Sequence, residues 1–156
     1  MGIARGRRRV LGLAAALATA ASLVLAGCAG GSAHPAGEAA PAATNDVVGV
    51  WVTGESYASP QVPYLDFASD GSWTGSDGCN GAQGDWSVDS SGMLSVTAGA
   101  QTLIGCDGVA LPGILSQAGM ALRQGEELIL ADTDGKAMIT LMPAPAGTVP
   151  TAAPTP

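Results

Sequence analysis

Three cysteines, one histidine and a set of aspartates are the side chains of this 156-residue chain that could carry chemistry. A cysteine or serine nucleophile needs a neighbouring base. The single histidine, His34, lies in a segment rich in alanine, glycine and proline that has too little apolar bulk to fold. A zinc site needs more Cys and His ligands than the folded part of this chain contains. Nucleophilic triads and zinc chemistry are therefore not expected, and no metal or cofactor is predicted.

Paired carboxylates could still act as a general acid and base, as in glycoside hydrolysis. Most of the candidate aspartates stand beside glycine or serine at turn signals, where a solvated turn is their usual role. We therefore expect turn aspartates and keep a carboxylate-based hydrolase as an alternative. The candidates are Asp66, Asp70, Asp77, Asp85, Asp89, Asp132 and Asp134.

The N-terminus carries an export signal. Arginines at position 5 and at positions 7–9 precede an apolar run over 10–26, and the small residues Ala26 and Gly27 come before Cys28. A basic region, an apolar region and small residues at a cleavage point are typical of a secretory signal. The arginines also loosely match a twin-arginine signal, although an ordinary basic region is the simpler interpretation.

The four residues Leu25-Ala26-Gly27-Cys28 resemble the lipobox of bacterial lipoproteins. The resemblance implies that residues 1–27 are removed and that the Cys28 thiol receives a diacylglycerol. Two acyl chains hold a protein stably at a membrane, whereas one chain holds it only marginally. We therefore expect an exported protein, lipid-anchored to the outer face of the cell membrane. The alternatives are a plain secretory signal or an uncleaved membrane anchor.

The charge of the remaining chain excludes one class of partner. Four of the six basic residues lie in the signal, which leaves Arg123 and Lys136 against thirteen acidic residues and a formal net charge of −11. Such a chain repels phosphate backbones and anionic lipid headgroups. Nucleic acid is not an expected partner, and membrane attachment must come from the lipid.

With Cys28 lipidated, Cys79 and Cys106 remain as an even pair. An even number of cysteines in an oxidising compartment predicts a disulfide. The alternative is two buried thiols that pack as small apolar side chains. The chain has no Cys-x-x-Cys motif, so thiol-redox catalysis is not expected.

Composition divides the chain into four parts. After the signal at 1–27, residues 28–45 contain the lipidated cysteine and a flexible tether, and residues 142–156 form a tail rich in proline, threonine and alanine. Residues 46–141 between them form one domain, which is large enough for one modest core.

Strand signals dominate this domain. Alternating apolar residues, separated by turn signals at Asp70-Gly71, Ser90-Ser91-Gly92 and 132–135, predict about seven or eight short strands. The apolar residues Leu111, Leu115, Ala118 and Leu122 recur at helical spacing, and Pro112 suits a first helical turn. The expected fold class is mainly β with one helix (α+β): a small antiparallel sheet or open barrel, linked by the disulfide.

The domain resembles the META/HslJ-like (DUF306-type) family of small envelope proteins, which includes many lipoproteins. A Gly-x-Trp strand, a Gly-Cys-Asn with a later glycine, a Thr-x-x-x-Cys and a closing hairpin carry the resemblance. These elements are Gly49-x-Trp51, Gly78-Cys79-Asn80 with Gly84, Thr102 with Cys106, and 128–135. Their chemistry favours a structural role, since glycine and asparagine satisfy tight turns, with a binding surface as the alternative.

The resemblance implies a non-enzymatic protein with a role in envelope maintenance or stress response. We expect binding of a protein or peptide, such as an envelope protein, through the sheet face or an open strand edge. One alternative is a small-ligand module with an apolar cavity lined by Trp51, Phe67, Trp73 or Trp86. The other is the carboxylate-based hydrolase of envelope polysaccharide. The sequence sets no oligomeric state.

Overall fold

The computed structural model describes residues 37–102, 104–105 and 107–146. Contacts divide the chain into Met1–Gly31 and Ser32–Pro156, and every described residue lies in the second unit. Within the described residues, no helix is both long enough and apolar enough to cross a membrane.

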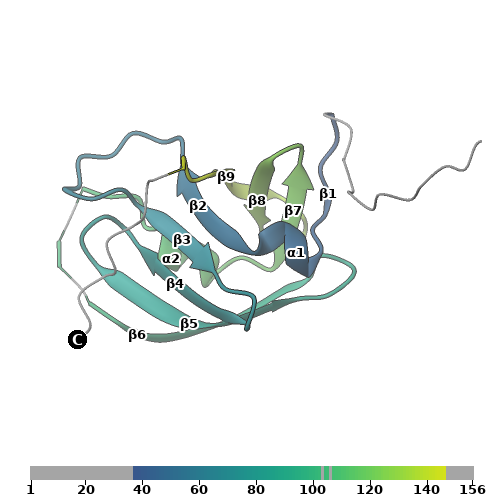
Figure 1. The fold of residues 1–156 in the computed structure, drawn as a ribbon, viewed down its shortest axis with the longest axis horizontal. Helices are drawn as coiled ribbons and strands as arrows, with labels where there is room; N and C mark the ends of the chain where they lie inside the picture. Colours follow the sequence, from purple (N-terminus) through teal and green to yellow (C-terminus); the bar gives the residue numbers. More distant parts are fainter. Residues whose placement is uncertain (1–36, 103, 106, 147–156) are drawn as a thin grey trace, which may run out of the picture. The chain divides into compact units, whose positions relative to one another are not determined.

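The described chain forms one antiparallel sheet and two short helices (Figure 1). The sheet has nine strands in the order β1-β7-β8-β9-β2-β3-β4-β5-β6 within the described residues. The helices are α1 (Thr44–Val47) and α2 (Leu111–Leu115). The strands are β1 (Ala40–Pro41), β2 (Gly49–Thr53), β3 (Tyr64–Phe67), β4 (Ser72–Ser76), β5 (Gly81–Val88), β6 (Leu94–Gln101), β7 (Met120–Gln124), β8 (Glu127–Ala131) and β9 (Ala137–Pro143).

The predicted mainly β fold is confirmed, and the strand count is slightly higher than the seven or eight expected. Hairpins join β3 to β4, β5 to β6 and β8 to β9 at the predicted turns. In each turn a glycine takes a positive φ: Gly71 (89°), Gly92 (80°) and Gly135 (79°). An L side chain is rarely tolerated there, which explains the glycine at each turn.

The sheet curls so that the start of β6, at one end of the strand order, touches β7, the strand next to the other end. Met93, just before β6, forms a bridge with Met120 at the start of β7. Backbone hydrogen bonds flank the bridge, from Leu94 N to Gly119 O and from Ala121 N to Gly92 O, each 2.9 Å long. The result is a curled half-barrel in which only the beginning of β6 reaches β7.

The core fills the inside of this curled sheet. Leu111 and Leu115 of α2 are fully buried, and α2 packs against β3 and β4 (Figure 1). The other large buried side chains come from most of the strands. They include Trp51, Leu65, Phe67, Trp73, Trp86, Leu128, Leu130 and Leu141.

The helix prediction is correct in place and wrong in length. The apolar stripe predicted a helix as far as Leu122, but α2 ends at Leu115 and Leu122 lies in β7. The chain changes from helix to strand at Gly119, whose N–H donates to Ala131 O (2.8 Å) and whose carbonyl accepts the Leu94 N–H. Glycine weakens a helix by about 1 kcal/mol relative to alanine, so sheet hydrogen bonds prevail over the helical pattern.

Ordered structure extends beyond the expected domain at both ends. In the segment interpreted as a tether, Ala40 and Pro41 pair with β7, and Ala42 is buried and donates its N–H to Ala121 O. At the other end β9 continues to Pro143, which pairs with Trp51. Short polar and alanine-rich segments carry no periodicity, so their pairing with an existing strand edge was not visible in the sequence.

Candidate functional site

The Gly-Cys-Asn motif lies in the turn between β4 and β5, where Asn80 holds a second loop. The Asn80 amide nitrogen donates to Ile104 O (2.8 Å), and the Asn80 carbonyl oxygen accepts Ile104 N–H (2.5 Å). Asn80 is only 8% exposed, whereas the Ile104 side chain is 66% exposed. An amide side chain that pairs with both backbone groups of one residue acts as one rung of a sheet. Asn80 therefore fixes the segment that leads from β6 to α2.

Asp77 completes this turn. One carboxylate oxygen accepts the N–H groups of Cys79 (2.8 Å) and Asn80 (2.6 Å), and the other accepts the Asn80 amide (2.8 Å). Partial burial raises the pKa of Asp77, but the hydrogen bonds from Asn80 and Cys79 outweigh it, and the net pKa is lowered. Hydrogen bonds to the ionised form favour that form. Asp77 therefore acts as an ionised acceptor inside the turn.

Two glycines allow the loops to approach this turn. Gly78 has φ 99°, and a Cβ there would overlap the Ser59 hydroxyl of the β2–β3 loop. A Cβ on Gly108 would overlap the Asp77 carbonyl oxygen. Thr102 accepts the Gly81 N–H through its hydroxyl (3.1 Å). We call this set the loop cluster; it comprises Ser59, 77–81, Thr102, Ile104 and Gly108.

The other motif residues have packing roles in two separate places. Gly49 has φ 135° and opens β2, and a Cβ there would lie 3.9 Å from the Trp51 indole nitrogen. Gly84 lies where β5 meets β6, and a Cβ there would overlap the Thr97 carbonyl oxygen. The motif is therefore distributed over the sheet and does not form one cleft.

Several predicted site residues lie outside the described residues. These are Leu25, Ala26, Gly27, Cys28 and Cys106. The lipid anchor and the Cys79–Cys106 pairing stay predictions.

The four aromatic rings named for a ligand cavity are all core residues. Trp51, Phe67, Trp73 and Trp86 are at most 5% exposed, and Phe67 packs edge-on against Trp86 with centroids 5.2 Å apart. Each indole N–H donates to a backbone carbonyl: Val47 O for Trp51, Thr97 O for Trp73 and Ala68 O for Trp86. Buried indoles with a satisfied N–H stabilise a core.

The turn aspartates bond to their own turns. The Asp70 carboxylate accepts hydrogen bonds from the hydroxyl and the N–H of Ser72, and the Asp89 carboxylate accepts hydrogen bonds from the same two groups of Ser91. These hydrogen bonds lower the pKa of both aspartates. Burial raises the pKa of Asp66.

No described pocket contains two carboxylates. Of the three described pockets, one is lined by Asp46, one by Asp77 and one by Asp85. In the described part of the chain, no group of three or more His, Cys, Asp or Glu side chains could hold a metal ion.

Strand β6 has a partner on one side only among the described residues. It pairs with β5 from Leu94 to Gln101, and only its beginning touches β7. The Leu94 N–H points away from β5, toward Gly119 O. Because backbone groups alternate sides along a strand, the N–H and C=O of Val96 and Ala98 point the same way, beyond the bridge to β7.

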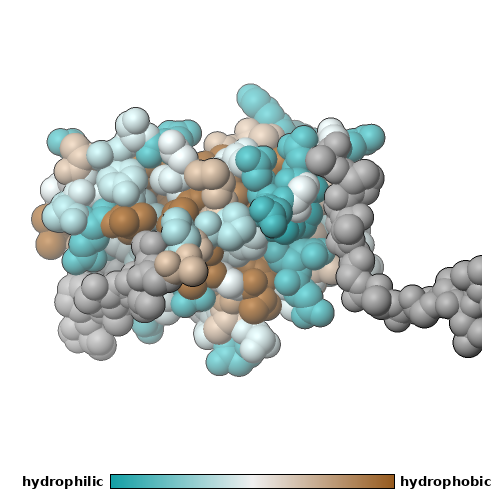
Figure 2. Space-filling view, turned by 45° about the horizontal axis from the view of Figure 1, so that its top comes forward, coloured by the Kyte–Doolittle hydropathy of each residue, from teal (hydrophilic) through white to brown (hydrophobic). Residues whose placement is uncertain are grey.

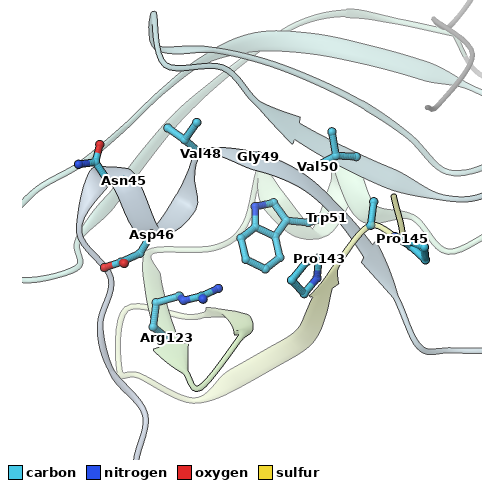
Figure 3. Close-up of a pocket in the computed structure, with 10 residues that line it drawn as sticks. Asn45, Asp46, Val48, Gly49, Val50, Trp51, Arg123, Pro143 and Pro145 are labelled. Atoms are coloured by element: carbon cyan, nitrogen blue, oxygen red, sulfur yellow. The ribbon is translucent and has the colours of Figure 1, made fainter. Parts of the chain in front are cut away.

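A pocket of about 540 Å³ opens between α1, β2, β7 and the end of β9 (Figure 3). Arg123 reaches across it, with its guanidinium carbon 5.1 Å from the Trp51 ring centroid. Pro143 and Pro145 line the opposite side. We call this the Arg123 pocket.

Sequence reasoning identified Arg123 only as a residual charge and did not place it in a site. The composition offered one clue, since Arg123 is one of two basic residues after the predicted export signal. Its place in β7 was obscured by the helical spacing of Ala118 and Leu122.

Comparison with known proteins gives one family. The META domain matches residues 45–145, which is most of the described chain. No curated protein matches the chain. One solved structure, a DUF4847 family protein from Bacteroides vulgatus ATCC 8482, is similar with a TM-score of 0.44 at 14% identity, over 60% of this chain and 91% of that one. The predicted family is confirmed: this chain belongs to the META domain family.

Proposed function

We propose that this META-domain protein is a lipid-anchored envelope protein that binds an extended protein or peptide segment along β6 and catalyses no reaction. The observation that carries the binding proposal is the open side of β6. An extended segment that adds to a sheet edge gains main-chain hydrogen bonds, and side-chain contacts then set its specificity. A role in envelope maintenance or stress response follows from the family resemblance.

The composition of β6 supports this proposal. Sheet edges are commonly protected by lysine, proline or inward-pointing charges. Residues 94–101 contain none of these, and Ser95, Thr97, Ala98 and Gly99 are exposed. Small uncharged side chains let a second backbone approach closely. The other end of the sheet differs, because β1 has two residues and one is Pro41, which has no N–H to donate.

The binding edge can be tested with a photo-reactive amino acid at Gln101, the exposed last residue of β6. We expect it to crosslink to a protein or peptide in intact cells, and the crosslink to be lost when Ala98→Pro is added. Proline at position 98 removes an N–H from the open side and no hydrogen bond to β5. Photo-crosslinking followed by gel analysis and mass spectrometry measures the yield.

Two controls make this test specific. Ser95→Ala changes an exposed side chain and keeps every backbone donor, so its yield should match the parent protein. The same photo-reactive residue at Thr140, exposed on β9, should give no adduct. An unchanged yield in Ala98→Pro, with circular dichroism matching the parent, would contradict binding along β6.

The anchoring part rests on Leu25-Ala26-Gly27-Cys28 alone. We expect Cys28→Ala to move the protein from the membrane fraction to the soluble fraction, because the thiol that would carry both acyl chains is lost. Fractionation and immunoblotting measure the shift. A variant with both Cys79→Ala and Cys106→Ala keeps Cys28 and should stay in the membrane fraction. Unchanged partitioning of Cys28→Ala would refute the anchor.

We also propose that Cys79 and Cys106 form a disulfide. Two contacts support the pairing: Asn80 holds Ile104, and Gly108 packs against the Asp77 carbonyl. Residues two positions before and after Cys106 therefore lie against the turn that contains Cys79. A disulfide closing a loop of this length stabilises by about 3 kcal/mol in the chain-entropy model.

Peptide mapping without reductant tests this pairing. We expect one crosslinked peptide pair that contains Cys79 and Cys106, and its disappearance after reduction. The reduced protein should unfold at lower denaturant concentration. Complete alkylation of both thiols in the native, unreduced protein would show that the bond is absent.

A further inference from the structure

The Arg123 pocket carries a positive charge that no described acidic group neutralises. The Arg123 guanidinium donates one hydrogen bond, from Nη1 to Glu126 O (2.9 Å), and stacks on Trp51. It makes no ion pair with any described residue. A guanidinium has five N–H donors, so most of the donors of Arg123 are available to a ligand.

The nearest acidic side chain of the pocket is committed elsewhere. Asp46 accepts the Ala43 N–H through Oδ2 (2.9 Å). Figure 3 shows its carboxylate pointing away from the Arg123 guanidinium and from the Trp51 ring. Arg123 is half-buried and has no described ion-pair partner, although the chain has thirteen acidic residues. Its charge is therefore available to bind an anion.

The remaining walls offer an apolar surface and few donors. Pro143 and Pro145 have no backbone N–H. The Ala144 N–H is used by Val50 O (2.9 Å), and the Trp51 indole N–H is used by Val47 O (2.7 Å). Among the described lining residues, Arg123 is therefore the one charged hydrogen-bond donor, and it lies next to proline rings; the Asn45 amide is the other side-chain donor.

We propose that the Arg123 pocket binds a carboxylate attached to a flat or apolar group. A carboxylate accepts two parallel hydrogen bonds from the guanidinium fork, and its apolar part would lie against the prolines, beside the stacked Arg123 and Trp51 side chains. Lys136, the other basic residue of the described chain, is not among the pocket residues, so the pocket has a single positive charge. One charge matches a monoanion better than a phosphate dianion. The volume of about 540 Å³ is in the usual range for small-molecule sites.

Two sources share this chemistry: a free small carboxylate and the C-terminal carboxylate of a peptide. The site does not depend on the open side of β6, because none of its residues belongs to that strand. A negative result for peptide binding along β6 would therefore not contradict the carboxylate site. A negative result for the carboxylate site would likewise not contradict binding along β6.

The test is an NMR titration of the full-length protein with benzoate, benzamide and phenyl phosphate, following the three tryptophan indole signals. We expect benzoate to shift the Trp51 signal in a saturable way. Benzamide has the same shape without the charge, and it should bind at least tenfold more weakly. Phenyl phosphate should bind no better than benzoate.

Matched variants identify the cation responsible. Arg123→Gln should weaken benzoate binding at least tenfold, and Arg123→Lys should weaken it less, because it keeps the charge and loses the fork. Lys136→Gln removes the same charge from an exposed hairpin and should bind benzoate as the parent does. Equal losses in Arg123→Gln and Lys136→Gln would overturn the proposal, as would no saturable shift of Trp51 in the parent protein.

A second titration distinguishes the two sources. A tripeptide ending in phenylalanine with a free carboxylate is compared with its C-terminal amide. Tighter binding of the free-carboxylate tripeptide than of benzoate would assign a peptide C-terminus, and weaker binding would assign a small carboxylate. Equal binding of the tripeptide and its amide, together with benzoate binding no better than benzamide, would overturn the carboxylate site.

Discussion

Replacing Gly84 with alanine is expected to lower the free energy of unfolding by about 3 kcal/mol, at the upper end of the usual cost of overpacking. A Cβ at this position would overlap the Thr97 carbonyl oxygen and lie 2.9 Å from the Trp73 indole nitrogen. Trp73 donates to the same carbonyl (3.0 Å). The added methyl group therefore forces the β5 and β6 backbones apart and weakens a hydrogen bond to a buried tryptophan.

Thermal unfolding followed by circular dichroism measures this change, and we expect Tm to fall by on the order of 15 °C. Near-ultraviolet spectra should change as well, because Trp73 lies at the altered position. Gly105→Ala is the matched control, since a Cβ at position 105 would meet nothing within 4 Å. Similar Tm values for the two variants would show that the approach of β5 to β6 does not require glycine.

Asn80→Ala is expected to cost about 2 kcal/mol or more, because it leaves backbone groups of Ile104 and one oxygen of Asp77 without their partner. The Asn80 side chain makes three hydrogen bonds between 2.5 and 2.8 Å. The loss should be local at first, so the Ile104 amide should exchange with solvent much faster than amides of the core strands.

Hydrogen exchange and chemical denaturation measure the two effects separately. Gln83→Ala is the control, since Gln83 is exposed on β5 and its side chain makes no hydrogen bond among the described residues. It should leave both the stability and the exchange of Ile104 near the parent values. Unchanged protection of Ile104 in Asn80→Ala would contradict the role of Asn80 as the clamp of the loop cluster.

The features that the sequence predicted well are those encoded by local residue type. Turn glycines and aspartates identified the hairpins at Gly71, Gly92 and Gly135, and alternating apolar residues identified most of the strands. The Gly-Cys-Asn motif, together with the Gly-x-Trp strand, the Thr-x-x-x-Cys and the closing hairpin, identified the family. In each of these cases the residue that signals the element also makes the contact that stabilises it, as Asp77 and Asn80 show.

The features that the sequence could not predict depend on partners far along the chain. The strand pairing of Ala40 and Pro41 depends on the edge of β7 and on no property of their own. The helical spacing through Leu122 was real, but Gly119 gains hydrogen bonds from two distant strands. Arg123 became a candidate binding residue only when the fold placed it over Trp51.

The unequal ends of the sheet set a limit on how far any assembly could grow. The outer side of β7 is occupied by β1 and by the chain at Gly92 and Leu94, and β1 itself ends in a proline. Among the described residues, β6 is then the one long strand that could accept another. A single added strand would cap it, and two copies joined through β6 would form a closed twofold pair. The architecture thus favours complexes of fixed stoichiometry and resists fibre formation, although β6 carries no charge to prevent it.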